Sequence, residues 1–118
     1  MTQNEVIRNL YVGDDFYNDE DYDQIVDLRE WDAERTFIEQ DYQYIAGIIY
    51  TISVLHTEDD KVLVHCHGGM DRSPFIVAMY LHEHKDMEPM EAYEFVKSKR
   101  KETFIHDDWM RAYITLSY

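Results

Sequence analysis

The sequence predicts an α/β fold in which a small central sheet is flanked by helices. Two observations predict this class: short runs of β-branched apolar residues, each long enough for a strand, alternate with longer segments whose apolar residues recur at helical spacing. The length sets the number of domains, because 118 residues form one hydrophobic core and the chain contains no Pro-rich or Gly/Ser-rich linker. We therefore expect a single domain over residues 1–118.

The first half of the chain is expected to hold two strands and the longest helix. A strand is predicted over residues 6–12, ending at Gly13, and the acidic residues 14–23 that follow it form a loop or a short helix. The sequence QIVDL over residues 24–28 predicts the second strand. A long helix is then indicated by apolar residues at spacings of four, three, four and three, namely Ile38, Tyr42, Ile45, Ile49 and Ile52.

The second half begins with the run KVLVH over residues 61–65, which is typical of a strand buried on both faces. A polar turn over residues 66–73 separates this strand from a helix predicted over residues 74–85. Proline suits the first turn of a helix, so another helix is expected from Pro89 onward, and the last is predicted over residues 107–116. The helix from Pro89 ends in a basic cluster, which consists of Lys97, Lys99, Arg100 and Lys101. We expect this end of the helix to be solvated, with its positive charges complementing the helix dipole.

The chain is strongly acidic, with 25 Asp and Glu against 11 Lys and Arg and a net charge of −14. Residues 1–60 hold 16 of the acids and only 3 of the bases. A field of this sign repels nucleic-acid phosphates and anionic lipid headgroups, so we expect no nucleic-acid partner and no membrane partner. No apolar run approaches the roughly 20 residues that span a bilayer, and residues 1–10 do not resemble a signal peptide. These features predict a soluble, cytoplasmic protein.

The segment that carries chemistry lies between the strand at 61–65 and the following helix, and it reads HCHGGMDRS over residues 65–73. A strand, a tight turn and a helix N-terminus direct backbone N–H groups and the positive end of a helix dipole into one concavity, which suits an anion. Cys66, the only cysteine, would lie in that field, which favours a thiolate. The planar guanidinium of Arg72 can hold two oxygens of a phosphate. A thiolate beneath a phosphorus atom is a nucleophile for phosphoryl transfer.

These residues resemble the His-Cys-x5-Arg-Ser signature of the cysteine-based protein tyrosine phosphatases, and HCHGGMDRSP followed by FIVAMYL is similar to the small dual-specificity branch. A weaker similarity covers residues 7–13 and 89–100, so most of the chain can be laid on the family pattern. The resemblance implies a phosphatase-like α/β fold whose active site is formed by a strand, a P-loop and a helix. It also implies hydrolysis of phosphomonoesters.

The resemblance assigns roles to single residues. Cys66 would be the nucleophile that forms a phosphocysteine, and Arg72 would hold the phosphate. Ser73 would stabilise the thiolate when it leaves, and His65 would orient the loop and tune the thiol. The remaining phosphate contacts would come from the backbone of the loop, at His67, Gly68, Gly69, Met70, Asp71 and Arg72.

The family also uses an aspartic acid on a separate loop, which protonates the leaving oxygen and then activates water. In this branch that residue lies just ahead of the long helix, a position that Asp32 matches best. Asp27 is the alternative, although its place within QIVDL favours a carboxylate at a strand end. The chain is shorter than the family pattern, in which another strand precedes the acid loop. Either that element is absent here, or residues 24–28 are themselves the strand that leads into the acid loop.

The expected function is therefore hydrolysis of phosphotyrosine, with phosphoserine and phosphothreonine as further substrates, without a cofactor and without a metal. The expected partners are a phosphorylated protein or peptide and a phosphate or other oxyanion in the loop. One alternative is removal of phosphate from RNA 5′ ends, against which Asp71 and the net charge count. Another is a phosphoprotein-binding module without catalysis, against which the presence of Cys66, Arg72 and Ser73 counts. We expect core or pocket-wall positions for Trp31 and Trp109, and surface or satisfied positions for His56, His82, His84 and His106.

Overall fold

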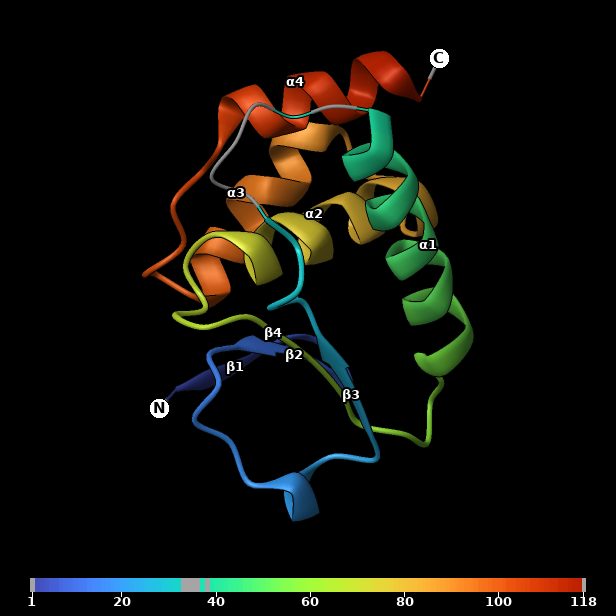
Figure 1. The fold of residues 1–118 in the computed structure, drawn as a ribbon. Coiled ribbons are helices and arrows are strands. Elements are labelled where there is room, and N and C mark those ends of the chain that lie inside the picture. Colours follow the sequence, from blue (N-terminus) through green and yellow to red (C-terminus); the bar gives the residue numbers. More distant parts are fainter. Residues whose placement is uncertain (1, 33–36, 38, 118) are drawn as a thin grey trace.

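The computed structural model describes residues 2–32, 37 and 39–117, and this part of the chain contains a four-stranded mixed sheet in the order β1-β2-β4-β3 (Figure 1). Strand β2 (Leu10–Gly13) pairs antiparallel with β1 (Gln3–Ile7) and parallel with β4 (Val62–His65). Strand β3 (Gln24–Asp27) pairs parallel with β4 on its other side. The α/β class and the strands expected at 24–28 and 61–65 are confirmed.

The prediction of one strand over residues 6–12 was wrong, because this segment contains the turn of a hairpin between β1 and β2. The chain reverses at Asn9, whose φ of 67° lies in the left-handed region that asparagine tolerates better than most residues. The Glu5 carboxylate accepts a hydrogen bond from Asn9 N at 2.9 Å. Since no glycine or proline marks this turn, the apolar residues on either side of it look continuous in the sequence.

Helices α1 (Glu39–Leu55), α2 (Arg72–His84), α3 (Pro89–Lys99) and α4 (Asp107–Leu116) gather on one face of the sheet (Figure 1). Helix α2 crosses β2 and β4, while α1 packs on β3 and α3 on β1. The expected apolar face of α1 is buried at Ile45, Ile49 and Ile52, and Ile38 lies outside the described residues. Within the part of the chain that the structure describes, no helix has the length and apolar character needed to cross a membrane.

The acidic segment 14–23 covers the opposite face of the sheet, below it in Figure 1. The segment contains a short 3-10 helix, η1 (Asp19–Asp21), whose three residues are exposed. The ring of Tyr17 packs on His65 with 4.7 Å between the ring centroids, and Asp23 N donates to Lys61 O at 2.9 Å. Strand β4 is therefore buried on both faces, as its apolar sequence predicts, although helices cover only one of them.

The carboxyl ends of β2, β3 and β4 lie at one edge of the sheet, because these three strands are parallel. Gly13 and Asp27 are both in register with His65. The segments that follow these strands therefore meet at the same place, which is where open α/β sheets bind ligands.

Candidate active site

Residues 66–71 connect β4 to α2 and hold the Cys66 sulfur against the first turn of that helix. Cys66 is 2% exposed, and Ser73 N donates to its Sγ at 3.4 Å. Ser73 Oγ lies 3.3 Å from the same sulfur and 3.1 Å from Gly13 O. The hydroxyl has one proton, which it donates either to the sulfur or to the carbonyl. Ser73 can therefore stabilise a thiolate and release it again when the sulfur is protonated or bonded.

Helix α2 begins at Arg72, two residues before the predicted start, so Arg72 and Ser73 belong to its first turn. Helix N-termini carry unpaired N–H groups and a partial positive charge, which favour an anion at this end of α2. Residues 73–81 are all buried, which places the helix under the other elements and fixes its direction relative to β4. Local sequence and burial thus put Cys66 at the start of the loop and Arg72 in the helical turn that directly follows it.

Arg100 supports this loop from behind, and the expectation that it is part of a solvated helix end was wrong. It is 2% exposed. Its Nε donates to Gly69 O at 2.6 Å and its Nη2 to Gly68 O at 3.4 Å, while Nη1 donates to Thr2 O at 3.0 Å and Asn4 Oδ1 at 2.9 Å. In a trans peptide the C=O and the following N–H point in opposite directions. Carbonyls held by Arg100 therefore turn the N–H groups of Gly69 and Met70 away from it.

Gly69 is the position in the loop that requires glycine. Its φ is +67°, and an added Cβ would lie 2.6 Å from Arg100 Nη2 and 2.6 Å from the Gly13 carbonyl carbon. The neighbouring Gly68 is a matched control, because a Cβ built there meets nothing within 4 Å.

We expect Gly69→Ala to lower the free energy of unfolding by about 1–3 kcal/mol, since it combines a disfavoured backbone conformation with a backbone clash. Gly68→Ala should change it by less than about 1 kcal/mol. Urea denaturation of both variants measures the difference. Equal effects would show that the loop does not hold Gly69 in this conformation.

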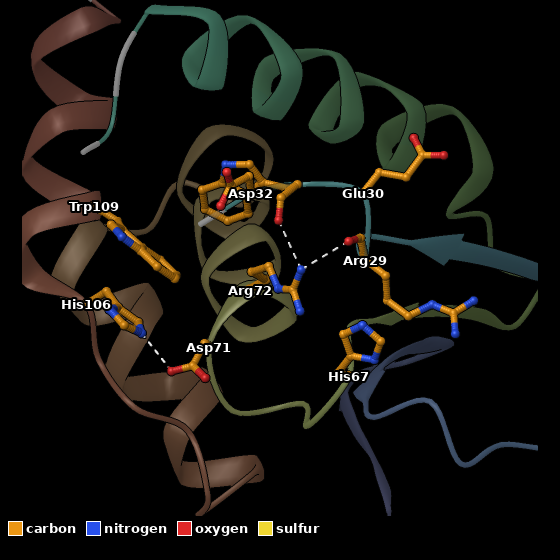
Figure 2. A pocket seen from close by; sticks show the side chains of 9 residues that line it. Arg29, Glu30, Asp32, His67, Asp71, Arg72, His106 and Trp109 are labelled. Carbon is orange, nitrogen blue, oxygen red and sulfur yellow. Dashed lines mark hydrogen bonds and ion pairs between the residues drawn. The ribbon is translucent and has the colours of Figure 1, made fainter. Parts of the chain in front are cut away.

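A cavity of about 540 Å³ opens beside the loop. Figure 2 shows Arg72 near its centre, where Nη1 donates to the backbone oxygens of Trp31 at 3.0 Å and Arg29 at 3.3 Å. The cavity is lined by Arg29, Glu30, Trp31, Asp32, His67, Asp71, Arg72, His106 and Trp109. It therefore joins the segment after β3, the loop after β4 and the start of α4.

One wall of the cavity is formed by His106, for which the sequence predicted only a surface or satisfied position. Its Nε2 lies 2.7 Å from Asp71 Oδ1, and its ring stacks on Trp109 with 3.6 Å between centroids and 9° between planes (Figure 2). The backbone N of His106 donates to the Tyr93 hydroxyl at 3.0 Å. Burial raises the pKa of Tyr93, so that hydroxyl stays neutral. The Asp71–His106 contact links the signature loop to α4, and Trp109 lies in the pocket wall, as expected.

The other wall carries Arg29 and His67, whose side chains face carboxylates. His67 Nδ1 lies 3.1 Å from Asp15 Oδ2, and this hydrogen bond lowers the pKa of Asp15. Arg29 Nη2 lies 2.7 Å from Asp27 Oδ2, and Arg29 Nη1 lies 4.0 Å from Asp15 Oδ2. Among the described residues, no group of three or more His, Cys, Asp or Glu side chains is placed to hold a metal ion.

The two candidates for the general acid lie in different places. Asp32 lines the cavity, at the end of the segment that leaves β3, and its neighbour Trp31 anchors that segment by donating to the buried Asp41 of α1 at 3.0 Å. Asp27 does not line the cavity. Hydrogen bonds from Arg29 hold the pKa of Asp27 at about 2. In the described residues no strand intervenes between β3 and α1, so β3 leads directly into the segment that carries Asp32.

Four lining or supporting residues were missed by sequence reasoning, namely Arg29, Glu30, Arg100 and His106. Arg100 lies in a lysine-rich cluster, and its only distinguishing signal is that a planar guanidinium suits several backbone carbonyls better than an ammonium group does. His106 stands alone in its segment and has no signal of its own. Arg100 and His106 act at the loop through contacts between residues more than 30 positions apart.

The sequence matches the family described as "Dual specificity phosphatase, catalytic domain" over residues 5–115. Dual specificity protein phosphatase 5 of Rattus norvegicus is 43% identical over 49 residues, which cover 42% of this chain and only 13% of that protein. The crystal structure of human DUSP28 is similar with a TM-score of 0.80 and 17% identity, covering 100% of this chain and 97% of the other. Tk-PTP in its active form gives a TM-score of 0.77 and 20% identity, covering 98% and 95% of the two chains. With this match over almost its whole length and the signature loop between β4 and α2, the chain belongs to the dual specificity phosphatase family of the cysteine-based protein tyrosine phosphatase superfamily.

Proposed function

We propose that this protein hydrolyses phosphotyrosine, and also phosphoserine and phosphothreonine, in proteins through a phosphocysteine intermediate, with residues 1–118 acting as a single catalytic domain. The observation that carries the proposal is the arrangement of one loop, in which the Cys66 sulfur accepts from Ser73 N while Arg72 projects into the adjoining cavity. The family match supports protein phosphatase activity in general.

The proposed first step is attack of the Cys66 thiolate on phosphorus. The loop N–H groups and Arg72 hold the non-bridging oxygens, the S–P bond forms, and the P–O ester bond breaks. Asp32 gives its proton to the leaving oxygen, because an alcohol leaves more readily than an alkoxide. The products of this step are the free hydroxyl of the substrate and phosphocysteine.

In the second step Asp32, now ionised, takes a proton from water, whose oxygen attacks phosphorus. The S–P bond breaks, and its electron pair returns to the sulfur. The Ser73 hydroxyl donates a hydrogen bond to the new thiolate and keeps its proton, a contact that its 3.3 Å distance from Sγ permits. Inorganic phosphate leaves, and the starting state is restored.

The charges around the cavity support a substrate with a single phosphate. Glu30 and Asp71 both line the cavity, and their carboxylates repel additional phosphates near the one held by Arg72. An RNA 5′ end and other polyanions are for this reason disfavoured as substrates.

Phosphate release from p-nitrophenyl phosphate and from peptides with phosphotyrosine, phosphoserine or phosphothreonine tests the proposal. Turnover of the aryl phosphate and of at least the phosphotyrosine peptide is expected. Binding of phosphopeptides without any release would instead identify a binding module, and release from 5′-triphosphorylated RNA alone would identify an RNA phosphatase.

Asp32→Asn is expected to slow hydrolysis of alkyl phosphates by about 10²–10³-fold and that of activated aryl phosphates much less, because only a poor leaving group needs the proton. The variant should also lose one limb of the pH–rate profile. Glu30→Gln is the matched control, since Glu30 is another acid that lines the cavity. Equal rates for Asp32→Asn and the wild-type protein on both substrates would exclude Asp32 as the acid.

A further inference from the structure

His65, the residue before the nucleophile, is completely buried with one ring nitrogen poorly satisfied. Its Nδ1 lies 3.3 Å from Cys66 O, so Nδ1 carries the proton of this contact, because a carbonyl only accepts. Its Nε2 has no hydrogen-bond partner among the described residues. The Asp27 carboxylate lies near this nitrogen, with 3.9 Å between His65 Nε2 and Asp27 Oδ1. This distance is too long for a hydrogen bond and short enough for an attraction between charges.

The sheet itself sets this approach. Asp27 and His65 are direct partners in the parallel register of β3 and β4, and Leu28 N donates to His65 O at 2.9 Å. Both side chains lie at the carboxyl ends of their strands, and the next residue after His65 is Cys66. Asp27 is therefore placed next to the nucleophile's own neighbour, although it does not line the cavity.

Asp27 is held ionised and in one orientation by Arg29. The Arg29 backbone N donates to Asp27 Oδ1 at 2.9 Å, and Arg29 Nη2 donates to Oδ2 at 2.7 Å. These hydrogen bonds keep the pKa of Asp27 at about 2, so the carboxylate carries its charge throughout the neutral pH range. Its effect on His65 is thus constant over any pH at which the thiol is studied.

We propose that Asp27 is a positioning residue for the nucleophile: acting through His65, it orients the imidazole and favours a positive charge on it, and this charge favours the Cys66 thiolate. The inference rests on the proposed function, in which Cys66 attacks phosphorus. Asp27 itself touches neither the substrate nor the reacting atoms.

The other groups around this pair do not replace the carboxylate. The Tyr17 ring packs on His65, with 4.7 Å between centroids, and Arg29 faces Asp15, which in turn binds His67. The pKa of Tyr44 on α1 is raised overall, mainly by burial and in part by the charges of Glu30 and Asp27, while the charge of Arg72 acts in the opposite direction. Among the described residues, Asp27 is the one acid within 4.0 Å of the His65 ring nitrogens.

The test is the pH dependence of Cys66 alkylation by iodoacetamide in Asp27→Asn. The chain has one cysteine, so the reaction reports on this thiol alone. Loss of the carboxylate is expected to move the midpoint of the profile upward by about 0.5–1 pH unit, because a charged neighbour no longer supports the imidazolium. Asp27→Ser, which removes the same charge, should give the same shift, and Asp27→Glu should restore most of the original midpoint.

Asp59→Asn is the matched control, because it removes the same charge at an exposed position before β4, at the far end of that strand from His65. It should leave the midpoint unchanged. In a His65→Asn background, Asp27→Asn should produce no further shift, since the effect passes through the imidazole. An unmoved midpoint in Asp27→Asn, or the same shift with and without His65, would overturn the proposal.

Alkylation needs no substrate, so this result is independent of turnover. A shifted midpoint in a protein that releases no phosphate would support the Asp27–His65 coupling and refute the proposed function. An unshifted midpoint in a protein that hydrolyses phosphotyrosine would refute only the coupling.

Discussion

Cys66→Ser should abolish phosphate release, with a loss in kcat of at least about 10³-fold, while binding of phosphate or tungstate remains within about tenfold of the wild-type affinity. The reason is that a serine hydroxyl is not ionised at neutral pH. The groups that would hold the oxyanion, which are the loop N–H groups and Arg72, are unchanged. Steady-state kinetics with p-nitrophenyl phosphate and calorimetric titration with tungstate measure the two quantities.

Turnover and tungstate binding together separate a chemical role of Cys66 from a structural one. Residual turnover above a few per cent would contradict the covalent mechanism. A loss of both turnover and tungstate binding would show that the sulfur holds the loop together, because Ser73 N donates to it. Ser73→Ala serves as a comparison, since it leaves the nucleophile in place and removes only the hydroxyl beside it.

Arg100→Met is expected to lower the free energy of unfolding by about 3–5 kcal/mol and kcat/KM by more than tenfold. A buried guanidinium that donates to three backbone carbonyls and one side-chain amide loses several charge-assisted hydrogen bonds at once, each worth about 1.5–3 kcal/mol before compensation. The carbonyls of Gly68 and Gly69 would then be free to turn, and the N–H groups of the loop with them. Urea denaturation and aryl phosphate kinetics measure the two effects.

Lys101→Met is the control for this substitution, because Lys101 is the next residue, carries the same charge and is exposed. It should change stability by less than about 0.5 kcal/mol. Arg100→Lys should recover little of the lost stability, since a single ammonium group cannot reach all of the acceptors that the three nitrogens of the guanidinium contact. Equal behaviour of Arg100→Met and Lys101→Met would mean that the loop keeps its form without the arginine.

The parts of the site that could be predicted are those that lie within a few residues of each other. Cys66, Arg72 and Ser73 lie within eight consecutive residues, and both the apolar run before them and the helix that begins at Arg72 are visible as local patterns. Their distances in the structure follow from that local order, as in the 3.4 Å contact between Ser73 N and Cys66 Sγ. The hairpin at Asn9 was local too, but asparagine in the left-handed region is a weaker signal than glycine.

The sequence by itself determined the α/β class, the strand that precedes Cys66 and the loop that carries the family signature, because strand hydrophobicity, turn residues and helix periodicity act over short stretches of chain. Only the tertiary structure decided which distant side chains support that loop: Arg100 behind Gly69, His106 against Asp71, and Asp27 beside His65. The sequence favoured Asp32 over Asp27 as the acid only by position, whereas the structure shows that Asp27 faces Arg29 and that Asp32 lines the cavity. The physical reason is that strand register and helix packing set where a side chain points, and both depend on contacts between residues far apart in the chain.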